Sequence, residues 1–187
     1  LYSAIKSKKD VIKILTILVI TAFAIAIYGF GQRYYYWPVY STMNREFSKG
    51  VTLYLTEHAR VQSTFAGHYD LAAWLVVVLP ILLTIALSAK NNLIKLIAHL
   101  GHWVGLWLII ESAARSSFAA YIVGITVVVF FLSLQKKRLI EKLMYFVSRY
   151  FLVGVTVLIT MIYFGDSMAE RLLQVVESYP QVAQTYN

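Results

Sequence analysis

Five long apolar runs divide the chain, and short polar segments separate most of them. A helix needs about 20 mostly apolar residues to cross the hydrocarbon core of a bilayer, and each run comes close to that length. The pattern predicts an all-α fold: a polytopic transmembrane helix bundle, in one membrane domain over residues 1–187. The expected spans are residues 11–31, 71–89, 96–113, 116–134 and 146–165.

The polar segments predict how the bundle is oriented. Cytoplasmic segments are richer in Lys and Arg, and the bias is strongest in short loops. With the N-terminus inside, the basic residues of the inner segments are Lys6, Lys8, Lys9, Lys13, Lys90, Lys95, Lys136, Lys137, Arg138 and Lys142. Those of the outer segments are Arg33, Arg45, Lys49, Arg60, Arg115 and Arg171. We therefore expect the N-terminus inside and the C-terminus outside.

Two outer segments are long. Residues 32–70 form the first outer loop, and residues 166–187 are expected to begin a larger one. A loop as long as the first is more often functional than incidental. Because the chain begins with Leu1 rather than Met, we expect it to be part of a longer protein.

The composition agrees with a membrane location. Hydrophobic residues make up 59% of the chain and charged residues only 14%, against about a quarter in soluble domains. The net charge of +8 does not indicate nucleic acid, because the basic residues lie in short clusters between apolar runs and not on one solvated face. The expected partner is the lipid bilayer. Without cysteine, the chain has no disulfide or thiolate metal site.

A polar cluster around Arg60 leads directly into the second span. The planar guanidinium of arginine suits phosphate, because it makes two parallel charge-assisted hydrogen bonds. Gly67 provides a hinge between this cluster and the span. The other polar candidates within ten residues of Arg60 are Ser63, Thr64, His68 and Asp70.

A second polar interruption, from Glu111 to Ser117, separates the third and fourth spans. Arg115 lies at its centre, and a charge so near the membrane is by default a functional hypothesis. Ser116 and Ser117 are expected at the helix N-cap, where free N–H groups and the dipole bind anions. The alternative is that Glu111 and Arg115 form a simple i,i+4 pair at a helix end.

The histidines of the third span are weaker candidates. His99 and His102 are three residues apart, a spacing that can hold a metal ion. Because no third ligand is in register, we expect hydrogen bonding between helices, and no metal. Elsewhere the spacing of a serine or cysteine hydrolase, a P-loop or a Rossmann turn is missing.

Three motifs together resemble those of a known family. The segment Arg60-Val-Gln-Ser-Thr-Phe, followed by Leu71-Ala-Ala, resembles the R-x-x-G-T-F … L-A signature of the O-antigen ligase and polymerase superfamily. Ala114-Arg115-Ser116 is similar to its S-R-[SG] motif, and Tyr28-Gly-Phe-Gly-Gln32 to its Y-G-x-x-Q motif. The resemblance covers about residues 11–166. The chain departs from the family pattern at 67–70, at 111–114 and in having Ala before Arg115, which leaves the acceptor open.

The resemblance implies an enzyme of the inner (cytoplasmic) membrane that acts in lipopolysaccharide or other surface polysaccharide biosynthesis. Such enzymes transfer a glycan from undecaprenyl pyrophosphate to an acceptor lipid, glycan or protein on the outer face, with no cofactor. It implies that Arg60 and Arg115 grip the pyrophosphate as catalytic residues. A histidine base would lie beyond Asn187. The residues expected to contact substrate are Ser63, Thr64, His68, Asp70 and Ser116.

Two other functions stay open from the residues. A membrane transporter of a small anion such as bicarbonate would also use two outer arginines, but it should carry polar features near mid-membrane. The expected spans are apolar at their centres, which favours the glycan transferase. A non-catalytic membrane anchor or assembly protein is the third possibility, and the dense polar sequence of the first outer loop counts against it.

Overall fold

The computed structural model describes residues 7–56 and 59–165. It is all-helical over these residues, and five of its helices are long and apolar enough to cross a membrane. The expected fold class is confirmed, and the chain is a multi-pass membrane protein. The five helices are α1 (Lys8–Tyr34), α3 (His68–Ser88), α4 (Asn92–Glu111), α5 (Arg115–Leu134) and α6 (Leu139–Phe164).

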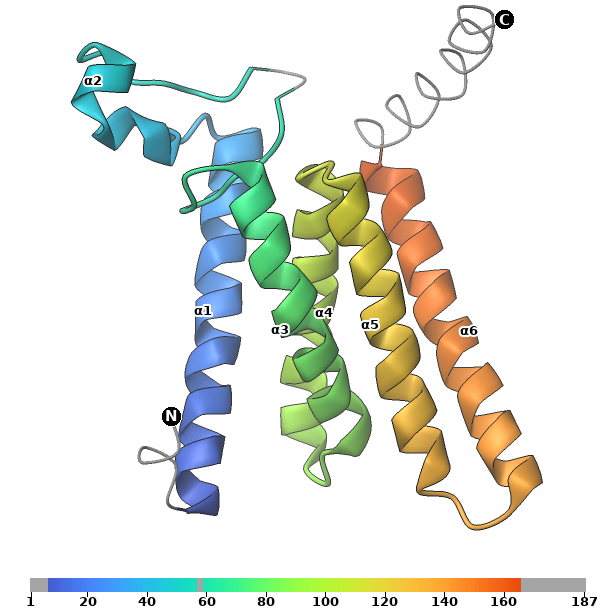
Figure 1. Cartoon of the computed structure of the whole chain (residues 1–187). Helices are drawn as coiled ribbons and strands as arrows, with labels where there is room; N and C mark the ends of the chain where they lie inside the picture. Colours follow the sequence, from blue (N-terminus) through green and yellow to red (C-terminus); the bar gives the residue numbers. More distant parts are fainter. Residues whose placement is uncertain (1–6, 57–58, 166–187) are drawn as a thin grey trace, which may run out of the picture.

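The five helices run alternately up and down (Figure 1). Short turns join α3 to α4, α4 to α5 and α5 to α6, while the long segment after α1 carries η1 (Tyr40–Met43) and α2 (Arg45–Ser48). The C-terminal ends of α1, α4 and α6 and the N-terminal ends of α3 and α5 therefore meet at one end, which we call the loop end. Which side of a membrane the loop end faces stays a prediction, and residues 166–187 lie outside the described part.

Local capping explains where several helices begin. Ser7 and Asp10 form a capping box at the start of α1, and the Asn91 side chain accepts the amides of Leu93 and Ile94 at the start of α4. The last helix begins at Leu139, well before the expected 146. Its first turns are rich in strong helix formers, so the helix continues past the apolar run into the basic turn.

The core lies between α3 and α4. Helix α3 packs on α4 and α5, while α4 also contacts α1 and α6. Four leucines of α3 are almost completely buried: Leu71, Leu75, Leu79 and Leu82. The outward faces of α1 and α6 instead expose large apolar side chains such as Ile17 and Phe151. Such faces suit contact with lipid, where the surroundings are as apolar as the side chain.

Helices α3 and α5 approach closely at one glycine. A Cβ atom added at Gly124 would lie 2.9 Å from Cγ of Pro80, inside van der Waals contact with a rigid ring. Gly154 on α6 is the natural comparison, because an added Cβ there meets nothing within 4 Å.

We expect Gly124→Leu to destabilise the bundle by about 1–3 kcal/mol, the usual cost of overpacking. Gly154→Leu should leave stability unchanged or raise it, because leucine is the better helix former. Thermal unfolding of the detergent-solubilised protein measures both. Equal melting temperatures for the two variants would contradict the close α3–α5 contact.

Candidate functional site

A buried glutamine holds the long loop onto the end of α1. Gln32 is 1% exposed. Its Nε2 donates to the carbonyls of Ser63 (2.9 Å) and Pro38 (3.2 Å), and its Oε1 accepts the Ser63 amide (2.8 Å). One side chain thus binds the outgoing and the returning limb of the loop.

Ser63 completes this attachment. Its backbone is left-handed (φ 52°), its side chain is fully buried, and its hydroxyl donates to the carbonyl of Ile25 at 2.6 Å. The hydroxyl expected to contact substrate is therefore turned onto α1, and we leave Ser63 out of the binding site. Its neighbour Thr64 is exposed at the loop surface.

Arg60 lies against the first turn of α3. Its Nη1 contacts Nε2 of His68 and donates to the Tyr69 hydroxyl at 3.2 Å, and its guanidinium carbon is 5.7 Å from the centroid of the Tyr69 ring. Two of the expected site residues, Arg60 and His68, are therefore in contact. Asp70 is exposed in the same turn, where the helix dipole favours a carboxylate, and within the described residues no ion pair joins it to Arg60.

Arg115 is the first residue of α5 and is exposed. The expected N-cap at Ser116 and Ser117 is wrong, because Ala114 occupies the cap without a side-chain hydrogen bond. The helix begins early because Ala113 adopts a left-handed conformation (φ 48°) that ends the turn after α4. Ser116 is exposed in the first turn, where helix N–H groups lack a carbonyl partner within the helix.

Glu111 connects the segments that carry three arginines. The Val61 amide donates to the Glu111 carbonyl (3.2 Å), and the Glu111 carboxylate pairs with Nε of Arg33 (3.5 Å). The Glu111 side chain is 4% exposed and that of Arg33 is 27% exposed. Arg60 and Arg115 flank these contacts in sequence. Glu111 ends α4 and Arg115 begins α5, so the two residues do not lie in one continuous helix, and the simple pair between them stays an untested alternative.

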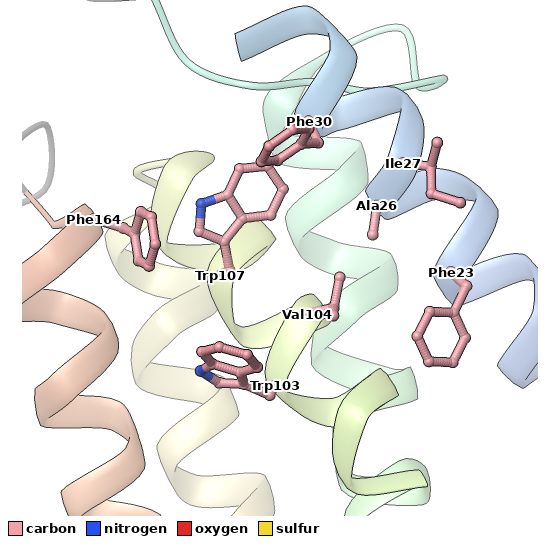
Figure 2. Close-up of a pocket in the computed structure, with 8 residues that line it drawn as sticks. All are labelled: Phe23, Ala26, Ile27, Phe30, Trp103, Val104, Trp107 and Phe164. Carbon is pink, nitrogen blue, oxygen red and sulfur yellow. The ribbon is translucent and has the colours of Figure 1, made fainter. Parts of the chain in front are cut away.

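An apolar groove of about 350 Å³ lies between α1, α4 and α6, next to the loop end (Figure 2). The Trp107 ring is at its centre, with ring centroids 6.0 Å from Phe30, 6.5 Å from Tyr34 and 6.5 Å from Phe164. Trp107 is one helical turn before Glu111, the residue that pairs with Arg33. Eight residues line it: Phe23, Ala26, Ile27, Phe30, Trp103, Val104, Trp107 and Phe164.

The intramembrane histidines differ from each other. Nε2 of His102 on α4 is 3.2 Å from the Tyr121 hydroxyl on α5, and both residues are buried. The expected hydrogen bond between helices is therefore confirmed for His102. His99 is exposed, and both histidines line a cavity of about 230 Å³ between α3, α4 and α6, together with Thr156. Among the residues described, no group of three or more His, Cys, Asp or Glu side chains is placed to hold a metal ion.

Comparison of the chain with protein-family models, with curated proteins and with solved structures gives no match.

Replacing Gln32 with Leu is expected to loosen the loop. The change leaves the amide and carbonyl of Ser63 buried without their partner, which costs about 1–3 kcal/mol for each unsatisfied group. Trypsin should then cleave the loop at Arg45 and Lys49 at least about fivefold faster than in the wild type. The control is Gln62→Leu, at a half-buried position in the same loop. Equal cleavage of both variants would contradict the role of Gln32.

Two glutamates give a matched test of the ion pair at the loop end. Removing one partner of a fully buried pair costs about 3–5 kcal/mol, while exposed pairs contribute about 0–1 kcal/mol. The Arg33–Glu111 pair, with a buried glutamate and a half-buried arginine, is expected between these values. Glu111→Ala should therefore lower the melting temperature clearly. Glu141→Ala should not, because its pair with Arg138 is 3.9 Å long and both side chains are exposed. The same small effect from both substitutions would show that the Arg33–Glu111 pair does not hold the loop end.

Proposed function

We propose that the chain is the membrane domain, or part of it, of a glycan transferase of the O-antigen ligase and polymerase type. The enzyme would take a saccharide from undecaprenyl pyrophosphate and pass it to an acceptor on the outer face of the cytoplasmic membrane. The observation that carries the proposal is the hydrogen bond from Val61 to Glu111, because it joins the segments of Arg60 and Arg115 at one end of the bundle.

The chemistry needs cations at this place. An acceptor hydroxyl gives its proton to a general base as its oxygen attacks the anomeric carbon of the sugar. The bond from that carbon to the pyrophosphate oxygen breaks, and negative charge grows on the departing pyrophosphate. Arginines already in position stabilise that charge at the transition state. In this proposal Arg60 and Arg115 contact the pyrophosphate, with the amides and hydroxyl of the first turn of α5 at Ser116 adding donors. The contact of His68 with Arg60 keeps the guanidinium oriented.

The aromatic groove is consistent with a lipid-linked substrate. A polyprenyl chain needs an apolar path inside the membrane, and the groove offers one lined by aromatic and aliphatic side chains (Figure 2). Its Trp107 is one helical turn from Glu111, which pairs with Arg33. A carrier whose chain lies in the groove would have its pyrophosphate at the loop end. In the proposed orientation the loop end faces outward, since the basic residues Lys90, Lys136 and Lys137 lie in the turns at the opposite end.

The decisive experiment measures glycan transfer from undecaprenyl-pyrophosphate glycan by the full-length protein. Arg60→Ala and Arg115→Ala should each lower kcat by about 100- to 1,000-fold, the usual effect of removing a group that stabilises developing charge. Arg45→Ala is the matched control, because Arg45 is an exposed arginine of the same loop and should change little. Full transfer by both variants, with unchanged melting temperatures, would reject the proposal.

A second candidate function is transport of a small anion such as bicarbonate. The cavity lined by His99, His102 and Thr156 favours it, because a transporter needs polar groups at mid-membrane depth. Anion flux into proteoliposomes tests this candidate. Flux that is lost in His99→Ala, together with absent glycan transfer, would favour the transporter over the transferase.

A further inference from the structure

A second groove lies outside the five long helices, at the loop end. Its volume is about 510 Å³, within the range of about 300–1,000 Å³ that is usual for small-molecule sites. Two aromatic rings line it and are open to solvent, with Tyr40 46% and Phe47 68% exposed. Within the described part of the chain neither ring stacks on another ring. The groove is lined by Tyr40, Met43, Asn44, Phe47 and Ala66.

The fold holds this groove in shape. Asn44 caps α2 by accepting the Phe47 amide at 3.2 Å, which fixes the helix turn that presents the Phe47 ring. The Val39 amide donates to the Leu53 carbonyl (2.9 Å), and the Thr42 hydroxyl accepts the Leu53 amide (3.0 Å). These bonds join residues before and after α2, so the segment that carries η1 and α2 forms a closed loop. Its aromatic side chains are therefore presented by a hydrogen-bonded scaffold.

The groove adjoins the arginine site. Ala66, which lines the groove, lies two residues before His68, and His68 contacts Arg60. Helix α2 lies beyond the loop end of α1 (Figure 1). This groove is thus formed by the loop beyond the bundle, while the apolar groove of Figure 2 lies among the membrane-spanning helices.

We infer that this outer groove binds the saccharide of the lipid-linked donor. The inference rests on the proposed function, because the donor extends from its lipid chain through the pyrophosphate to the sugar. The C–H faces of a sugar ring are weakly positive and are attracted to the negative faces of aromatic rings, here Tyr40 and Phe47. The amide nitrogen of Asn44 is a donor for sugar hydroxyls. Rings with this exposure suit a ligand that approaches from water.

The test compares two carriers in nanodiscs: undecaprenyl pyrophosphate with its glycan and the same carrier without it. Wild-type protein should bind the glycan-bearing carrier more tightly. Tyr40→Ala and Phe47→Ala should each weaken binding of that carrier by about two- to tenfold and leave the bare carrier unchanged. Tyr54→Ala is the control, because Tyr54 is an exposed tyrosine of the same loop that does not line the groove.

The outcomes separate this inference from the proposed function. If wild-type protein binds both carriers equally, the saccharide site is rejected while an Arg60-dependent affinity for the bare carrier still supports the transferase. If the bare carrier does not bind at all, the proposed function fails as well. Equal effects of Tyr40→Ala and Tyr54→Ala would also reject the saccharide site.

The competing interpretation is that the exposed rings contact the membrane surface. The chain has no cysteine, so Phe47→Cys gives a single site for a nitroxide label. In nanodiscs the label should be relaxed by a water-soluble nickel chelate, as expected for a groove open to water. Relaxation by oxygen dissolved in the hydrocarbon, with protection from the nickel chelate, would show that the ring is inserted in lipid and would overturn the inference.

Discussion

The hydrogen bonds of Gln32 are the constraint on which the loop end depends. A single amide side chain, buried at the last turn of α1, binds the loop at Pro38 where it leaves the helix and at Ser63 where it returns. The backbone polar groups of the loop are screened from water here. Because the glutamine amide both donates and accepts hydrogen bonds, it pairs with groups that a hydrophobic side chain would leave without a partner. With Ser63 fixed, Val61 reaches Glu111, and Arg60 reaches the first turn of α3.

The bundle offers polar and apolar surroundings at different depths. At the loop end, Arg33 pairs with the buried Glu111 that ends α4, and Arg115 begins α5 four residues later. Next to them Trp107 and its aromatic neighbours make an apolar groove in the span region. An amphiphile with a long apolar chain and an anionic head matches this order of environments. A small hydrophilic ion would need only the polar groups of the loop end and not the apolar groove.

Much of the fold was predictable from the sequence, because five apolar runs of spanning length leave few other folds. The sequence also singled out Arg60, His68 and Arg115, through polar residues beside apolar runs. Other features depend on contacts that no local pattern encodes. The Arg33–Glu111 pair joins residues of different helices, and periodicity did not reveal that Ser63 turns onto α1. The Ser116 cap was misjudged, because the left-handed turn at Ala113 starts α5 early.

The most direct test of the account is the affinity of the wild-type full-length protein for undecaprenyl pyrophosphate compared with undecaprenol, in nanodiscs of neutral lipid. The two ligands share the same apolar chain and differ only in the charged head. We expect the pyrophosphate to bind at least about tenfold more tightly, equivalent to about 1.4 kcal/mol, and added salt to weaken the preference. Equal affinity for the two would contradict an anionic headgroup site at the loop end.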